Sequence, residues 1–325
     1  MMMENKYQLN RKLTIINEWY MKKICFTTAI IFILSNSIFA QINTEEKDGG
    51  IWILDGKRKV GFYQKEDAGI DQEKGRANYW HPLYLPDGTV LTEDRPADHP
   101  LHRGIFLGWH QVYVGNRPVG NTWILEDINI VVKKAEFQKI DKTKGQLETL
   151  SLWQSPLWEN GKTFIEESTK YTFYTQKSNY NVIKMEITLN ALADTVYLGG
   201  SKDSKGYGGF SVRMKLPKDI KFFSSGGEVT PINDAVEAGQ YMNISGTLTA
   251  DNKQGGIMIY ADPKNQKGPQ TWILRKEGSM QNPVFPGRAL TPIVKGNPIK
   301  LTYYLVPYVG TIKPEKIIKD YRFSN

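Results

Sequence analysis

Ile51-Trp52-Ile53-Leu54, then Asp55-Gly56, then Val60-Gly61-Phe62-Tyr63 form the stretch that decides the fold class. Two runs rich in β-branched and aromatic residues flank a turn dipeptide, an order that predicts a strand, a tight turn and a second strand. Similar turn signals recur along the chain at Pro86-Asp87-Gly88, Lys144-Gly145, Asn160-Gly161, Gly226-Gly227 and Gly255-Gly256. Turns at this frequency predict a protein built from antiparallel strands.

The segments between these turns have the composition of strands. Examples are Tyr171-Thr172-Phe173-Tyr174 and residues 182–189, 256–260 and 301–306. Only residues 314–321 have a helical character, because Pro314 suits a helix start and Ile317 gives the segment an apolar side. No linker, charge block or internal repeat divides residues 41–325. The sequence therefore predicts an all-β fold, with one large antiparallel sandwich or barrel domain over residues 41–325 and a short C-terminal helix.

The N-terminal region has the three parts of a secretory signal peptide. Met21-Lys22-Lys23 is positively charged, residues 24–34 are apolar, and the segment up to Ala40 ends in a small-residue cleavage site. We predict that residues 21–40 are removed, that residues 1–20 are an over-extended start, and that the mature chain begins at Gln41. We expect a secreted or periplasmic protein without stable membrane insertion after cleavage, because the apolar run is too short to span a bilayer.

Charge and cysteine content exclude several classes of function. The 325-residue chain has a formal net charge of +8, but without residues 1–40 it keeps 37 basic and 32 acidic residues, scattered along the sequence. We therefore expect neither nucleic acid nor an anionic membrane surface as a partner. The single cysteine, Cys25, lies in the predicted signal peptide. A mature chain without cysteine has no disulfide and no thiol nucleophile, so a hydrophobic core must stabilise it.

All four histidines, His81, His99, His102 and His110, lie within thirty residues of one another. Histidine titrates close to neutral pH, so this stretch favours a general acid or base. The alternative is that these are ordinary polar residues of loops, since a cluster in sequence is only a hypothesis about a site.

The segment Asp98-His99-Pro100-Leu101-His102-Arg103-Gly104 predicts a stiff loop, because proline fixes a backbone angle and glycine permits close approach. Its arginine offers a rigid fork of donors for an anion or a polar sugar face. A metal site is the competing interpretation. His102 and His110 would be about 26 Å apart on a straight strand at about 3.3 Å per residue, so a metal on His99 and His102 needs a third ligand from elsewhere. We expect no resident cofactor, and a divalent metal stays an alternative.

Glu167 is the predicted carboxylate partner of these groups. Alternation along residues 164–173 places it on the apolar side of a strand, together with Ile165, Thr169, Tyr171 and Phe173. An acid on that side is usually paired or functional, because burying an isolated charge is costly. Pairing with a structural arginine or lysine is the alternative.

Most tryptophans are expected in the core. Trp123 and Trp272 lie beside motifs rather than inside alternating strands, so we predict that they form stacking surfaces for sugar rings.

Four elements form a specific combination. They are residues 98–104 with Gly108-Trp109 and Asn121-Thr122-Trp123, then Gly208-Gly209-Phe210-Ser211-Val212-Arg213, then Asp262-Pro263-Lys264-Asn265, and Trp272-Ile273-Leu274-Arg275 with Gly278, Asn282-Pro283 and Phe285. In this combination nearly all of residues 41–325 resembles the PmoA-like family, a group of bacterial, often secreted proteins named after a methane oxygenase but functionally unassigned. The sequence departs from the family pattern at Leu101, where a second histidine is common, and at Tyr241, where tryptophan is usual.

The resemblance implies a two-sheet super-sandwich similar to galactose-mutarotase-like folds, in a setting of carbohydrate processing. The oxygenase name does not fit the residues, because a copper or iron oxygenase needs a closed set of histidine or carboxylate ligands that this sequence does not display.

Together these observations predict a secreted carbohydrate-active enzyme that cleaves a glycoside, or isomerises or epimerises a sugar, by proton transfer. The candidate catalytic residues, predicted to line one cavity, are His102, Glu167, His99 and Arg103. The candidate substrate-binding residues are His110, Trp123, Arg213, Asn265, Trp272 and Arg275. The alternatives are a carbohydrate-binding protein without turnover and a metal-dependent enzyme centred on His99 and His102.

Overall fold

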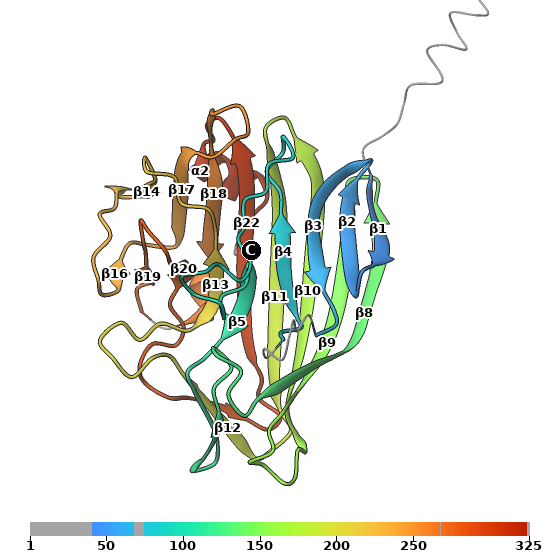
Figure 1. Cartoon of the computed structure of the whole chain (residues 1–325), viewed down its shortest axis with the longest axis vertical. Coiled ribbons are helices and arrows are strands. Elements are labelled where there is room, and N and C mark those ends of the chain that lie inside the picture. Colours follow the sequence, from blue (N-terminus) through green and yellow to red (C-terminus); the bar gives the residue numbers. More distant parts are fainter. Residues whose placement is uncertain (1–40, 68–74, 267, 324–325) are drawn as a thin grey trace, which may run out of the picture. The chain divides into compact units, whose positions relative to one another are not determined.

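The computed structural model describes residues 41–67, 75–266 and 268–323 (Figure 1). The predicted start segment (1–20) and signal peptide (21–40) lie outside the described residues and stay predictions. By its contacts the chain divides into Met1–Phe39 and Ala40–Asn325, and the account below concerns the second unit alone.

Two large antiparallel sheets and one small sheet make up this unit. The first large sheet has the strand order β1 (Ile42–Lys47), β2 (Gly50–Asp55), β3 (Arg58–Gln64), β4 (Tyr79–Leu83), β5 (Ile105–Gly108), β13 (Gly209–Arg213), β20 (Met280–Pro283), β19 (Thr271–Ile273) and β16 (Val236–Glu237). The second has the order β15 (Gly227–Glu228), β14 (Lys221–Ser224), β17 (Tyr241–Thr247), β18 (Gln254–Ala261), β22 (Ile299–Val309), β11 (Tyr180–Ala191), β10 (Thr163–Lys177), β9 (Lys144–Gln154) and β8 (Asn129–Asp141). The small sheet has the order β21 (Thr291–Val294), β12 (Thr195–Gly199), β6 (Gln111–Val114) and β7 (Arg117–Gly120).

The predicted hairpin at Asp55-Gly56 is confirmed, with Asp55 paired to Arg58 across the turn between β2 and β3. Two other predicted turns are displaced. The turns lie just before Lys144 and Gln254, so Gly145 lies in β9 and Gly256 in β18. In both strands the glycine is needed for close approach. A Cβ at Gly145 would lie 2.5 Å from the ring of Phe137, and one at Gly256 would lie 2.2 Å from a backbone oxygen.

The two large sheets pack face to face around one core. The Trp80 ring of β4 lies 5.0 Å from the Tyr171 ring and 5.4 Å from the Phe173 ring of β10, measured between centroids. Along β10 the predicted alternation is confirmed, because Glu167 and Thr169 are buried with these rings. The expected all-β sandwich is therefore present, and aromatic pairs join its two layers.

The predicted C-terminal helix is also confirmed, as α2 (Pro314–Asp320). Its Ile317 packs in a second apolar cluster with Tyr304 and Val306 of β22, whereas Tyr303 and Leu305 of the same strand belong to the main core. Because side chains alternate across a strand, α2 covers the face of the second sheet that points away from the first. Within the described ranges no helix has the length and apolar character needed to span a bilayer.

Candidate functional site

The loop between β4 and β5 carries the histidine-rich motif. Gly104 passes so close to β4 that a Cβ would lie 2.2 Å from the carbonyl oxygen of Trp80, so a larger residue would displace the loop. The N–H of His102 donates to the carbonyl of His99 at 2.9 Å, and the N–H of Arg95 donates to the carbonyl of His102 at 3.1 Å. These bonds hold the motif as a compact turn in front of β5.

A cavity of about 230 Å³ opens beside this turn. Its walls come from segments that are far apart in the sequence, loops together with β19 and β20. Its lining includes His99, His102, Trp123, Tyr207, Arg275 and Asn282. Four of the ten residues predicted from the sequence are in this group. The fold therefore brings part of the predicted site together, and the other predicted residues lie around or below it.

Trp123 forms an aromatic wall of the cavity. Its ring stacks on the imidazole of His110 at 5.1 Å and meets the ring of Tyr207 edge-on at 4.7 Å. Asn121 Oδ1 accepts a hydrogen bond from the Trp123 N–H at 2.9 Å, and the buried Arg76 guanidinium donates to the Trp123 carbonyl at 3.0 Å. The wall is thus fixed in place, and His110 supports it without lining the cavity.

His99 and His102 stack on each other, with their ring centroids 4.4 Å apart and their planes 10° apart. Burial, with the nearby charge of Arg213, lowers the pKa of His102 to about 3. Burial lowers the pKa of His110 to about 4. Both His102 and His110 are therefore neutral at neutral pH.

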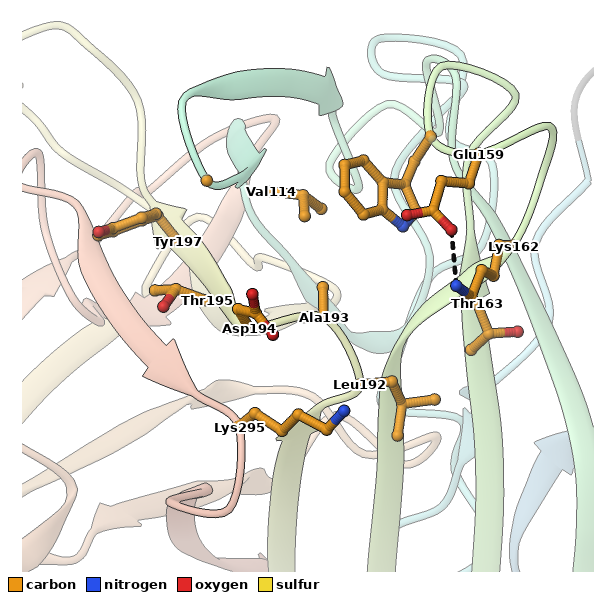
Figure 2. Close-up of a pocket in the computed structure, with 12 residues that line it drawn as sticks. Val114, Glu159, Lys162, Thr163, Leu192, Ala193, Asp194, Thr195, Tyr197 and Lys295 are labelled. Atoms are coloured by element: carbon orange, nitrogen blue, oxygen red, sulfur yellow. Dashed lines mark hydrogen bonds and ion pairs between the residues drawn. The ribbon is translucent and has the colours of Figure 1, made fainter.

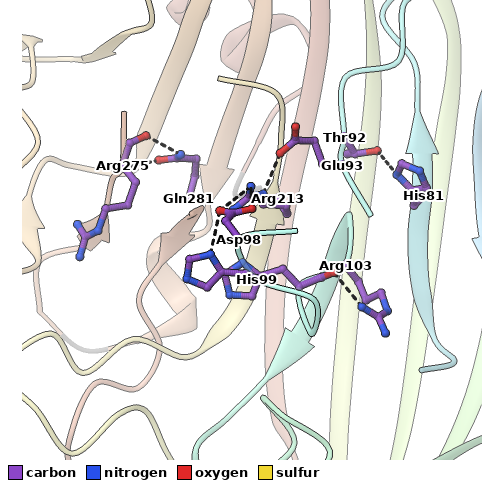
Figure 3. A network of polar contacts seen from close by, with 10 residues as sticks. His81, Thr92, Glu93, Asp98, His99, Arg103, Arg213, Arg275 and Gln281 are labelled. Atoms are coloured by element: carbon purple, nitrogen blue, oxygen red, sulfur yellow. Dashed lines mark hydrogen bonds and ion pairs between the residues drawn. The ribbon is translucent and has the colours of Figure 1, made fainter. Parts of the chain in front are cut away.

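His81 lies apart from the other three histidines. Its Nδ1 is 3.0 Å from the hydroxyl oxygen of Thr92, and burial lowers its pKa (Figure 3). It is not among the residues that line the cavity.

A chain of charged groups holds His99 at the cavity (Figure 3). His99 Nδ1 lies 2.9 Å from Asp98 Oδ2. Arg213, on β13, donates from Nη2 to both oxygens of Asp98 at 2.9 and 3.0 Å and from Nε to Glu93 at 2.9 Å. Burial alone would raise the pKa of Asp98, but the hydrogen bonds from His99 and Arg213 lower it overall. Asp98 therefore stays ionised and orients the imidazole.

Arg103 is buried below the turn and does not line the cavity. Its Nη1 donates to the carbonyls of Pro100 at 2.7 Å and His102 at 3.0 Å, and its Nε lies 3.8 Å from Asp94 Oδ1. These contacts fix the shape of the turn, so Arg103 has a structural position where the sequence suggested a catalytic one.

Glu167 differs most from the prediction, because it lies in the core and not at the cavity. Its Oε1 accepts from Asn78 Nδ2 at 2.8 Å and its Oε2 from Trp153 Nε1 at 3.0 Å, while Tyr63 donates to Asn78 at 2.8 Å. Burial raises the pKa of Glu167. The side chain points inward, as alternation predicted, but the interior it enters is sealed at 2% exposure.

The remaining predicted binding residues have different surroundings. Trp272 is fully buried in the main core and donates its indole N–H to the carbonyl of Gly239 at 2.9 Å, so it has no open face for stacking. Asn265 holds Thr302 through hydrogen bonds at 2.6 and 2.9 Å and pins its loop to β22. Arg275 does line the cavity, and it donates to the carbonyl of Asn233 at 2.7 Å.

The geometry does not favour a metal shared by His99 and His102. An imidazole binds a metal through a lone pair in its ring plane, and two nearly parallel rings direct these lone pairs side by side rather than to one point. His99 Nδ1 also faces the carboxylate of Asp98. Among the described residues no group of three or more His, Cys, Asp and Glu side chains is arranged to hold an ion.

A larger cavity of about 730 Å³ lies at another place, beside β12 and the turn between β9 and β10 (Figure 2). Trp158, Asp194 and Lys295 are among its lining, and Glu159 and Lys162 pair there at 2.6 Å. None of the described residues in its lining is a histidine. We therefore take the smaller cavity, where a histidine–carboxylate pair meets an aromatic wall, as the candidate active site.

A model of a family of unknown function, DUF6807, matches residues 52–322. The chain belongs to this family. The DUF6807 match spans every residue of the candidate site, but it does not confirm the PmoA-like naming. No curated protein matches the chain. Among solved structures, the crystal structure of a heparan sulfate lyase HepC mutant from Pedobacter heparinus is similar at 8% identity and a TM-score of 0.33, covering 85% of this chain and 36% of that one. The DUF6807 chain thus spans about a third of that lyase, and its function has to be argued from its own site.

Sequence reasoning missed several residues of the site. Asp98 stands directly before His99 in the quoted motif, and its role in orienting the imidazole was overlooked. Tyr207 precedes the glycine pair of the second family element and Asn282 belongs to the last element, but neither was singled out as a site residue. Lys205 and Asn233 also line the cavity, and no sequence signal marks them.

Proposed function

We propose that this protein is a carbohydrate-active enzyme that transfers a proton at the cavity, with His99 as the acid–base residue and Asp98 as its orienting carboxylate. The observation that carries the proposal is the 2.9 Å contact between His99 Nδ1 and Asp98 beside a wall formed by Trp123 and Tyr207.

His99 is the better base of the stacked pair. When Nδ1–H of His99 donates a hydrogen bond to Asp98, the lone pair is on Nε2. This is the tautomer needed to take a proton from a substrate. Arg213 holds Asp98 and is itself held by Glu93, so the imidazole is oriented before a ligand arrives. His102, with a pKa of about 3, is too weak a base at neutral pH and instead supports the His99 ring.

The lining suits a sugar ring. A sugar has an apolar C–H face that packs on aromatic rings and hydroxyls that need hydrogen-bond partners at the edge. Tyr207 is half-buried and offers a ring, and Trp123 adds the small part of its ring that is exposed. The polar groups are Lys205, Asn233, Arg275, Ser279 and Asn282. A volume of about 230 Å³ lies below the roughly 300–1,000 Å³ of sites for drug-sized ligands. One sugar ring is therefore the expected ligand.

The carboxylates favour proton abstraction over glycoside hydrolysis. Most glycosidases use two carboxyl groups that flank the scissile bond. None of the described residues that line this cavity is a carboxylic acid, and Asp98 is engaged by His99 and Arg213. Isomerisation, epimerisation and elimination all begin when one base takes a proton from carbon. The negative charge that develops in this step needs a nearby cation, which Arg275 and Lys205 would supply.

The test follows proton exchange in heavy water. The purified protein is incubated in D₂O with a panel of aldoses, ketoses, uronic acids and their glycosides, and NMR follows exchange of carbon-bound hydrogen and new products. We expect exchange with at least one sugar, and a loss of roughly 100-fold or more in rate for His99→Ala, the usual contribution of a positioned base. His81→Gln is the matched control, because His81 lies apart from the other histidines and does not line the cavity.

If a sugar binds the wild-type protein tightly but neither exchanges nor reacts, with and without added divalent metal, the protein is a carbohydrate-binding protein and not an enzyme. An unchanged rate for His99→Ala would remove His99 from its role.

We further propose that the protein is exported and cleaved after Ala40. The first strand begins at Ile42, so the proposed cut leaves the described fold intact. N-terminal sequencing of protein from the native host tests this, and a retained Met1 would contradict it.

A further inference from the structure

A second cavity, of about 750 Å³, lies between the end of α2 and two hairpins of the second sheet. The hairpins are those that join β8 to β9 and β10 to β11, and the lining includes Lys144, Tyr174, Lys177, Tyr180, Tyr321 and Arg322. It has no lining residue in common with the histidine cavity. We call it the tyrosine–lysine pocket.

Three tyrosine rings form one side of the tyrosine–lysine pocket. Tyr321 meets Tyr174 edge-on at 5.0 Å and Tyr180 at 6.4 Å, between ring centroids. Burial raises the pKa of Tyr174 and of Tyr321, so these phenols stay protonated and can donate hydrogen bonds. The rings therefore offer apolar faces and neutral donors together.

Positive charge is concentrated at the same place. The lining holds four cationic side chains and one carboxylate, that of Asp320, which Lys316 engages in an ion pair. Lys144 lies 3.9 Å from Asp141, whereas Lys177 and Arg322 have no acidic partner among the described residues. Cations left unpaired in a concave surface favour an anionic ligand.

The walls of this pocket are held by contacts elsewhere in the fold. Asn179 donates from Nδ2 to the carbonyls of Val309 at 2.7 Å and Thr311 at 2.9 Å, which ties the β10–β11 turn to the chain that leads into α2. The ring of Phe323 stacks on that of Tyr304 at 3.8 Å and fixes the chain after α2. The pocket is thus formed before a ligand binds.

We propose that the tyrosine–lysine pocket binds an acidic saccharide, whose carboxylate or sulfate groups pair with Lys177 and Arg322 while its ring packs on the tyrosines. The volume lies within the roughly 300–1,000 Å³ range of small-molecule sites, which suits a short saccharide segment. A neutral sugar would leave the two cations without partners. An anionic membrane is a less suitable ligand, because binding to a lipid surface requires a flat or protruding protein surface and this pocket is recessed.

Calorimetric titration of the purified protein tests the proposal with three probes of equal length, namely hexagalacturonate, sulfated maltohexaose and neutral maltohexaose. We expect at least one acidic probe to bind about tenfold or more tightly than maltohexaose, and its affinity to fall with salt. Comparison of hexagalacturonate with sulfated maltohexaose shows whether the pocket prefers carboxylate or sulfate groups. Lys177→Gln/Arg322→Gln should weaken the acidic probe by about tenfold or more, because it removes both charge-assisted contacts.

The control Lys57→Gln/Lys133→Gln removes the same charge from exposed positions outside the pocket and should change affinity less than about twofold. Equal loss in this control, equal binding of maltohexaose, or binding only to anionic lipid vesicles would each overturn the proposal. The site is independent of the proposed catalysis. His99→Ala should leave this affinity unchanged, and Lys177→Gln/Arg322→Gln should leave proton exchange unchanged, so either proposal can fail alone.

Discussion

Glu167 and Asp98 are two carboxylates with arginines nearby, and they differ in what completes their hydrogen bonding. Glu167, 2% exposed, accepts from Asn78 and Trp153 and has no contact with the cavity. Asp98, with a side chain 39% exposed, shares its oxygens between Arg213 and His99, and His99 lines the cavity. The comparison teaches that fixed donors can satisfy an inward acid completely, as at Glu167, whereas Asp98 shares its oxygens with a titratable neighbour that lines the cavity.

The largest effect should come from removing the interior carboxylate. Glu167→Ala leaves Asn78 and Trp153 without their acceptor and opens a void in the core. The free energy of unfolding should therefore fall by about 3–5 kcal/mol. Denaturant unfolding followed by tryptophan fluorescence measures it. Glu167→Gln keeps the volume and should lose less, and if it abolished turnover at full stability the carboxylate would belong to the active site after all.

Substitution of Asp98, the carboxylate next to the cavity, should lower the reaction rate and leave stability nearly unchanged. Asp98→Asn keeps the shape but no longer stabilises the required tautomer and charge of His99, so proton exchange should slow by roughly 100-fold at a nearly unchanged melting temperature. Glu93→Gln, one contact further from His99, is the graded control and should slow it less. A rate for Asp98→Asn within about twofold of wild type would contradict the assigned role.

Lowering the pH should change the free energy of unfolding in opposite directions through His102 at the cavity and Glu167 in the core. Because burial lowers the pKa of His102 to about 3 from an unfolded value near 6.5, the unfolded chain binds more protons between these values, and stability should fall as pH drops through this window. The raised pKa of Glu167 gives stability at low pH that is lost as pH rises through its folded pKa. Between pH 4 and 7 the free energy of unfolding should depend less steeply on pH for His102→Gln, and more steeply for Glu167→Gln, than for the wild type. The same dependence in all three proteins would refute both assignments.

The smallest effects come from deleting one hydroxyl in each region. Tyr63→Phe removes the donor to Asn78 beneath Glu167 and should lower stability by about 1 kcal/mol without changing turnover. Tyr207→Phe removes a hydroxyl in the lining of the cavity and should raise KM about two- to fivefold at unchanged stability. If the two variants exchanged these effects, the division between interior and cavity would be wrong.

The sequence predicted what local patterns determine. Alternation along β10 turned Glu167 inward, Pro314 marked the start of α2, and Asp55-Gly56 formed its turn. The sequence could not tell whether Glu167 enters the closed core or a cavity, because that depends on which sheet packs against β10. For the same reason Trp272 appeared available for stacking, although β19 turns it into the core. Charges such as Lys177 and Arg322 are scattered in sequence and meet only because α2 lies beside a distant hairpin.

Arg213 has a further consequence for how this protein can change. It stands on β13, which is paired on both sides within the first large sheet, and through Asp98 it sets the position of His99. The opposite wall, with Lys205, Tyr207 and Asn233, belongs to loops outside the strands. Under the proposed function, substitutions in those loops should alter which sugar fits, while Arg213 on β13 and Asp98 keep His99 in its place.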